Sequence, residues 1–88
     1  MTKRAIPEAQ RSGNLGVVPL TELKPNEEGE IAYIQTEDNK KMQKLMAMGV
    51  LPGNCIRLIQ TFPSYIFSVG YSEFAIDTSM AREIFVRR

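Results

Sequence analysis

A chain of 88 residues can form only one small domain, which buries roughly 60% of the surface exposed by its unfolded chain, so a large enclosed active site is not expected. The net charge of +1 is too small to predict a nucleic-acid partner, and no apolar run approaches the roughly 20 residues that span a bilayer. The lack of histidine excludes Ser-His and Cys-His nucleophiles and histidine-based metal sites, and the single cysteine excludes an internal disulfide.

The first 18 residues predict a flexible leader, because charged residues, Pro7 and glycines are mixed with apolar residues that follow no fixed period. The folded domain is expected over residues 19–88. The leader has three basic residues and one acidic residue, for +2, whereas residues 19–88 have eight basic and nine acidic residues, for −1. The leader has no signal-peptide apolar stretch, and a lone cysteine fits a reducing compartment. We therefore expect a cytoplasmic protein that does not insert into the membrane.

A first strand is predicted over residues 30–35, where β-branched and aromatic residues follow a glycine. Strict alternation would place Ile31 and Tyr33 on one face of this strand. It would place Ala32 and Ile34 on the other.

A helix of about ten residues is predicted next, preceded by polar residues that can cap its start. Its apolar residues Met42, Leu45, Met46 and Gly49 recur at spacings of three and four, which is typical of a buried helix face. Gly49 can adopt the left-handed conformation that ends a helix, and Pro52 prevents its continuation. We expect a tight turn at this point.

The remaining residues predict short extended segments joined by hairpins. These are strands over residues 55–62, 65–69 and 74–77, a helical turn over 79–82 capped by Thr78 or Asp77, and a last strand containing Ile84 and Val86. Five short strands cannot form a sandwich of two full sheets, but they can close or nearly close a small barrel. The sequence therefore predicts a mainly β fold, a small SH3-like β-barrel of about five strands with one α-helix and a short extra helical turn.

Several blocks of the chain resemble the FeoA family, whose members are small SH3-like barrels associated with the FeoB ferrous-iron transporter. The similar blocks, which run in the family's order from Pro19 to about Arg87, are Pro19–Pro25, Gly29–Ile31, Leu45–Gly53, Phe74–Ile76 and Ala81–Val86. The block Leu45–Gly53 is the most specific, since its helix end, apolar pair, proline and glycine follow the family closely. The hairpin at residues 63–66 is shorter than the usual family loop.

This resemblance implies a non-enzymatic cytoplasmic accessory protein of ferrous-iron transport that binds the cytoplasmic part of a FeoB-like GTPase transporter. Related barrels also form the C-terminal domain of DtxR-type repressors. A metal-responsive regulatory module is therefore the alternative, because a fold alone does not assign a function.

The predicted contact with the partner lies on the helix and the turn that follows it. Lysines 40, 41 and 44 occupy the polar side of the helix, where such a stripe is usually only solvated but can also meet an acidic surface. The rigid turn can present Met48 and Leu51 as apolar anchors. The expected partner-binding residues are Lys41, Lys44, Leu45, Met48 and Leu51.

Cys55 and the methionines are interpreted as structural. Cys55 starts a strand and has no base nearby in the sequence, so we expect a small core residue. Met42 and Met46 lie at core-facing helical spacing, where a thioether fills irregular gaps.

The carboxylates carry the weaker hypotheses. Glu27, Glu28 and Glu30 cluster near a glycine and could hold a hard cation such as Fe2+ weakly, although a solvated loop edge is the preferred interpretation. An enzyme would need a proton-transfer pair such as Glu73 and Glu83, and nothing in the sequence brings these two together. We expect no catalytic residues and no tightly bound cofactor.

Overall fold

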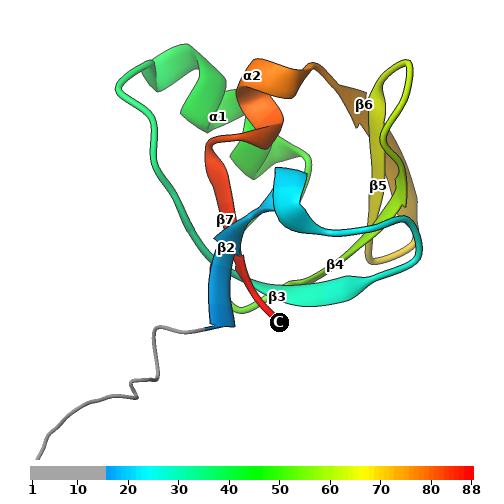
Figure 1. Cartoon of the computed structure of the whole chain (residues 1–88). Coiled ribbons are helices and arrows are strands. Elements are labelled where there is room, and N and C mark those ends of the chain that lie inside the picture. Colours follow the sequence, from blue (N-terminus) through cyan, green and yellow to red (C-terminus); the bar gives the residue numbers. More distant parts are fainter. Residues whose placement is uncertain (1–15) are drawn as a thin grey trace, which may run out of the picture.

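Six antiparallel strands form one strongly bent sheet, which a computed structural model describes over residues 16–88 (Figure 1). The strand order in space is β2-β7-β3-β4-β5-β6. The strands are β2 (Val17–Pro19), β3 (Glu28–Ile34), β4 (Cys55–Gln60), β5 (Tyr65–Val69), β6 (Ser72–Ile76) and β7 (Ile84–Arg87). The helices are the 3-10 helix η2 (Leu20–Glu22), α1 (Asn39–Ala47) and α2 (Thr78–Ala81). The predicted mainly β class with one α-helix and a short extra turn is confirmed.

The apolar core receives side chains from the sheet and from all three helices. Its members are Leu20, Leu23, Ile31, Leu45, Val50, Ile56, Leu58, Phe67, Ile76, Met80, Ala81, Ile84 and Val86. Within residues 16–88 no polar or charged side chain is buried. Full burial of one Leu, Ile or Phe side chain contributes about 1.5–3 kcal/mol, so this core is the main source of stability in a chain that cannot form an internal disulfide.

Strand β3 departs from the predicted alternation at Ala32. Its register against β7 shifts between Ile31 and Tyr33, which is the mark of a β-bulge that adds one residue to the strand. Ile31 therefore lies in the core, whereas Tyr33 is 44% exposed and its ring stacks on Phe85 with centroids 4.9 Å apart. The prediction that Ile31 and Tyr33 share a face is wrong, and Ile34 packs against the core in place of Tyr33.

The predicted meander of hairpins is present with small changes at the strand ends. β4 ends at Gln60, and the tip of the β4–β5 hairpin carries Phe62, which is 84% exposed. β6 begins at Ser72, after a two-residue loop in which Gly70 alone has a positive φ, of 63°. A glycine at the first central position is typical of a type II′ turn. Tyr71, the second residue of this loop, is fully exposed.

Strand β2 is a sixth strand that lies partly within the range assigned to the leader. Val17 and Val18 pair with Arg87 and Val86 of β7, and Val18 packs against the core. Two β-branched residues suffice here because β7 offers them an unpaired edge. The ordered domain therefore begins before residue 19, and the rest of the predicted leader, residues 1–15, lies outside the described part of the chain.

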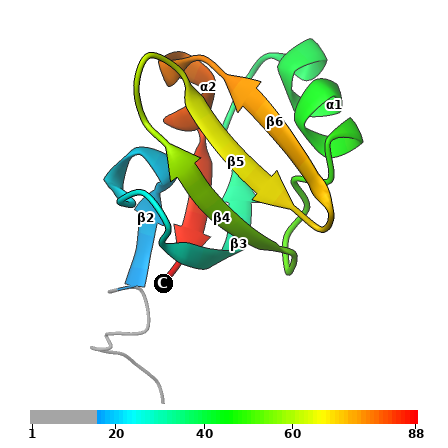
Figure 2. The same ribbon diagram turned by 90° about the vertical axis from the view of Figure 1, so that its right-hand side faces the viewer.

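Figure 2 looks onto strands β4, β5 and β6, which are neighbours in the sheet, with α1 seen at one side of the view. At one end of β6, a Cβ placed on Gly49 would be 3.2 Å from Cγ1 of Val69. At the other end lies Asp77, whose pKa is lowered mainly by a hydrogen bond from Met80 and, to a lesser degree, by the charges of Lys41 and Lys44.

Candidate docking surface

The start of α1 is fixed by an N-cap aspartate. Oδ1 of Asp38 accepts hydrogen bonds from the backbone N–H groups of Lys40, at 2.9 Å, and Lys41, at 3.2 Å. These two amides have no partner within the helix, so the cap satisfies donors that would otherwise need water. Two lysines therefore stand in the first turn, which contains no acidic residue.

The end of α1 is a Schellman motif closed by Gly49. The N–H of Gly49 donates to the carbonyl of Met46 and the N–H of Val50 donates to the carbonyl of Leu45, both at 3.0 Å. Gly49 has a φ of 95°, which confirms the predicted left-handed conformation. Leu45 and Val50 are both completely buried, as the apolar contact of this motif requires.

The turn from Gly49 to Asn54, called here the 49–54 turn, is fixed both internally and against β3. The Asn54 side-chain amide donates to the carbonyl of Gly49 at 2.9 Å, and the backbone N–H of Asn54 donates to the carbonyl of Leu51 at 3.0 Å. Two further bonds of 2.8 Å join Gly53 and Asn54 to the backbone of Ile31. The exposed side chain of Leu51 is therefore carried on a preformed turn.

The five predicted contact residues are distributed unequally between surface and core. Leu51 and Lys44 are exposed. Met48 is half-buried and packs against the core, and Lys41 is half-buried with its Nζ 3.4 Å from Oε1 of Glu83. Leu45, which is predicted to contact a partner, is completely buried and offers no exposed surface in this structure. It holds the helix on the domain instead.

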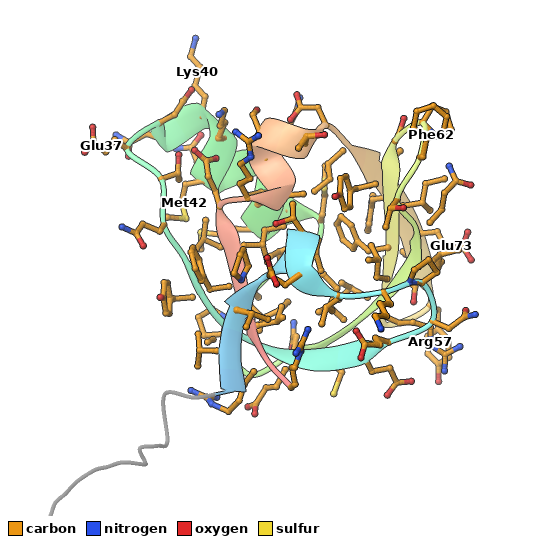
Figure 3. All side chains as sticks on the ribbon, viewed as in Figure 1. Glu37, Lys40, Met42, Arg57, Phe62 and Glu73 are labelled. Atoms are coloured by element: carbon orange, nitrogen blue, oxygen red, sulfur yellow. The ribbon has the colours of Figure 1, made fainter. Side chains whose placement is uncertain are left out.

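Further exposed residues of α1, which the predicted docking site does not include, join Lys44 on this surface. Met46 is 47% exposed, so the prediction that it packs in the core is wrong. The buried stripe of α1 is narrow and centred on Leu45, and a residue one position further is rotated by about 100° out of that stripe. The exposed residues of the helix besides Asn39, called here the α1 outer face, are Lys40, Gln43, Lys44, Met46 and Ala47. Lys40 extends away from the body of the domain (Figure 3).

Asp77 is a second acidic group near the lysines of α1, besides Glu83, which pairs with Lys41. Its Oδ1 accepts a hydrogen bond from the backbone N–H of Met80 at 2.8 Å and one from the hydroxyl of Ser79 at 2.9 Å. The Met80 bond is the main cause that lowers the pKa of Asp77 below 3.8, the Ser79 bond adds to it, and the charges of Lys41 and Lys44 contribute further. This carboxylate is the N-cap of α2.

Cys55 lies on the outer side of the sheet, so the prediction of a core residue is wrong. Strand alternation is the reason, because Ile56 and Leu58 are the residues of β4 that face the core. Cys55 lines a shallow open hollow of about 430 Å³ together with Glu28, Ile56, Arg57, Ser68 and Gly70. The hollow contains the ion pair between Arg57 and Glu28, at 2.7 Å.

The three carboxylates near Gly29 do not converge on one point. Glu27 accepts a hydrogen bond from the backbone N–H of Lys24 at 2.7 Å, Glu28 pairs with Arg57, and Glu30 lies 3.5 Å from Arg87. No group of three His, Cys, Asp or Glu side chains over residues 16–88 is arranged to hold a metal ion.

The two glutamates considered for proton transfer have separate surroundings. Glu83 pairs with Lys41, whereas Glu73 is exposed on β6 opposite Ser68 of β5.

No helix in the described part of the chain is long and apolar enough to cross a membrane.

Comparison with known proteins identifies both a family and a fold. A family model described as the FeoA domain matches residues 18–88. No curated protein matches the chain. A crystal structure of an iron uptake regulatory protein (FeoA) is 38% identical, covers 83% of this chain and 97% of its own, and has a TM-score of 0.75.

Two further solved structures place the fold. FeoA from Stenotrophomonas maltophilia, a zinc complex described as a prokaryotic SH3 domain protein, is 21% identical, covers 78% of this chain and 88% of its own, and has a TM-score of 0.71. IdeR from T. acidophilum is 25% identical, with coverage of 83% and 34% and a TM-score of 0.77. These likenesses confirm the predicted SH3-like fold.

Proposed function

The chain belongs to the FeoA family, an SH3-like family associated with ferrous-iron transport, and from this we infer that it is a non-enzymatic accessory protein that binds the cytoplasmic part of a FeoB-like GTPase transporter. The contact is made by the α1 outer face and the 49–54 turn. The protein acts on the cytoplasmic side of the membrane and supplies a shaped surface, while any nucleotide hydrolysis belongs to the transporter.

The observation that carries this proposal is the fixed position of Leu51. The hydrogen bonds of the 49–54 turn hold its backbone, so little conformational entropy is lost when a partner covers the side chain. An apolar side chain on such a preformed support is suited to act as a binding anchor. Met46, at the same end of α1, adds a second exposed apolar side chain.

The state of the polar groups supports a binding role over a catalytic one. The sequence has no histidine. Glu28, Glu30 and Glu83 form ion pairs, and Asp38 and Asp77 cap helices. Carboxylates engaged in this way stabilise the fold and are poorly placed to transfer protons.

The test is a calorimetric titration of the full chain against the purified cytoplasmic region of a FeoB-like transporter. We expect a dissociation constant of tens of micromolar or tighter, which corresponds to about −6 kcal/mol or more. Leu51→Ser should weaken binding by about tenfold, since loss of an anchor costs roughly 1–2 kcal/mol. Phe62→Ser is the matched control, because it removes an exposed apolar side chain from the tip of the β4–β5 hairpin (Figure 3). This tip follows β4, whereas the 49–54 turn precedes it.

Two results would contradict the proposal. One is the absence of binding by the wild-type chain at these concentrations. The other is equal weakening by Leu51→Ser and Phe62→Ser, which would indicate a contact without a defined site.

The second candidate function is a metal-responsive regulatory module, which the likeness to IdeR favours. It predicts that the isolated protein binds Fe2+ or Mn2+, measurable by anaerobic titration calorimetry. We rank it second because the glutamates near Gly29 are separately engaged with Lys24, Arg57 and Arg87.

A further inference from the structure

The lysines of α1 indicate what kind of surface the partner presents to this helix. We propose that Lys40 and Lys44 recognise a carboxylate-rich protein surface, positioned so that Leu51 enters an adjacent apolar pocket. This inference rests on the proposed function, since it concerns what the docking partner presents to the α1 outer face.

Helix α1 carries three positive charges, and within residues 16–88 the structure gives an ion pair for one of them. Residues 39–47 include three lysines and no acidic residue. Within residues 16–88, Lys41 is the lysine of α1 that forms an ion pair, with Glu83. Lys40 and Lys44 are exposed and lie one turn apart, so their side chains project from neighbouring positions of the helix surface.

Lys40 occupies a position that the helix itself disfavours. It stands in the first turn, where the helix dipole opposes positive charge and the Asp38 carboxylate that caps this turn offsets part of that effect. Its side chain extends away from the domain and from Glu37 (Figure 3). Lys40 therefore fits a role outside the domain.

The groups around Lys44 do not neutralise it directly. Asp77 is the neighbouring carboxylate, and its Oδ1 is already bonded to the N–H of Met80 and the hydroxyl of Ser79. The pKa of Asp77 is lowered mainly by the hydrogen bonds from Met80 and Ser79, and the charge of Lys44 is the smallest contribution. Lys44 thus remains available to a carboxylate from another molecule.

The rest of the surface favours a protein over other polyanions. Met46 and Leu51 are 47% and 37% exposed at the C-terminal end of the same helix, so cationic and apolar groups share one surface. Residues 19–88 carry eight basic and nine acidic side chains, which gives no general attraction to nucleic acid or to an anionic lipid bilayer. A protein surface can match both the two lysines and the apolar residues.

The test repeats the titration against the transporter's cytoplasmic region with a charge-reversed chain, Lys40→Glu with Lys44→Glu. The measurements are made at about 50 and 300 mM NaCl, which differ strongly in screening. Lys24→Glu is the matched control, because it makes the same kind of change at an exposed lysine. Lys24 belongs to the loop between η2 and β3, and Figure 1 shows this loop on the side of the domain away from α1.

We expect the wild-type chain and Lys24→Glu to bind alike and to bind more weakly at high salt. The charge-reversed chain should bind at least tenfold more weakly at low salt and should show little salt dependence. Lys40→Gln alone should raise the melting temperature, because it removes a cation from the first turn, and should weaken binding several-fold. A merely structural lysine would not give these opposite effects.

The other possible results distinguish a failure of this inference from a failure of the proposed function. Unchanged binding by the charge-reversed chain, or equal weakening by Lys24→Glu, overturns this inference and leaves the proposed docking intact. A wild-type chain that does not bind overturns the proposed function and this inference with it. Binding to phosphatidylserine-containing vesicles that is lost on charge reversal would show that the lysines recognise a lipid surface.

Discussion

The carboxylate of Asp77 shows how one side chain can stabilise an element and respond to pH. It caps α2 through the N–H of Met80, and this bond is the main reason that its pKa is lowered from 3.8. A group whose pKa is lower in the folded state stabilises the fold while it is charged. That contribution is present above the unfolded pKa and is lost as the pH falls through the folded pKa.

Asp77→Asn should therefore lower the melting temperature at neutral pH, because the amide carries no charge and accepts more weakly. The difference from the wild-type chain should shrink as the pH falls from about 4 towards 2. Thermal unfolding of both proteins, followed by circular dichroism across this range, measures the effect. A difference that stays constant down to pH 2 would show that the charge of Asp77 does not contribute.

Single residues were the hardest feature to predict from the sequence. Cys55 and Met46 are apolar in character, yet both are exposed, because each is one position away from residues that take the core positions. A shift of one residue reverses the face of a strand and rotates a helical side chain by about 100°. Only the packing of the whole sheet determines which of two adjacent apolar residues is buried. The docking site predicted from sequence accordingly includes one buried residue, Leu45, and omits Met46.

At the scale of the element, the end of α1 was the most predictable feature. The sequence Gly49 to Gly53 contains a glycine for the left-handed position, two apolar residues and a proline, and each acts through local backbone geometry. The structure has the expected positive φ at Gly49 and the two Schellman hydrogen bonds. Local rules are sufficient where the required interactions lie within a few residues.

Two glycines of this turn provide a matched pair for testing the helix end. Gly49 and Gly53 have φ values of 95° and 96°, so alanine is strained at both positions. A Cβ at Gly49 would also lie 3.2 Å from Val69, whereas one at Gly53 has no atom within 4 Å. Gly53→Ala should cost about 1 kcal/mol and Gly49→Ala more than that, because Val69 must also move.

Urea denaturation of the wild-type chain and both variants gives the free energies of unfolding that test this order. Equal losses of stability would show that Val69 moves aside without cost. No loss in either variant would contradict the left-handed conformation of these residues.

Strand β3 illustrates an element that local rules describe incompletely. Its position was predicted, but the bulge at Ala32 was not, and this bulge exchanges the roles of Tyr33 and Ile34. Bulges arise from the register between strands. Here the register is set by β7, which lies some fifty residues later in the chain.

At the scale of the whole molecule, the sequence predicts the class of the barrel but not its first strand. The number and spacing of the short strands, together with the resemblance to a known family, indicated an SH3-like barrel. Strand β2 was not predicted because three residues are too few to show the alternation of apolar and polar residues that marks a strand. In addition, Val17 pairs with Arg87, which lies at the other end of the chain. Long-range pairing of this kind is not visible in local sequence.

The contribution of β2 can be measured by comparing two truncated chains, residues 16–88 and residues 19–88. The shorter chain loses the pairing of Val17 and Val18 with β7, the hydrogen bond from Arg88 to Gly16 and the burial of Val18. Its free energy of unfolding should be lower by about 2 kcal/mol or more. Equal stability of the two chains would place the start of the cooperative domain at residue 19.

The pairing of β2 with β7 also determines how the domain resists mechanical force. Gly16 and Arg88 are joined by a hydrogen bond of 2.9 Å, so the two ends of the described chain emerge side by side. A pull between them would unzip the two strands one bond at a time, without shearing several bonds together. A linker that continued from Gly16 or Arg88 would leave the domain at this pair of strand ends, away from α1 (Figure 1). The domain could then be attached to a larger assembly while α1 stays uncovered.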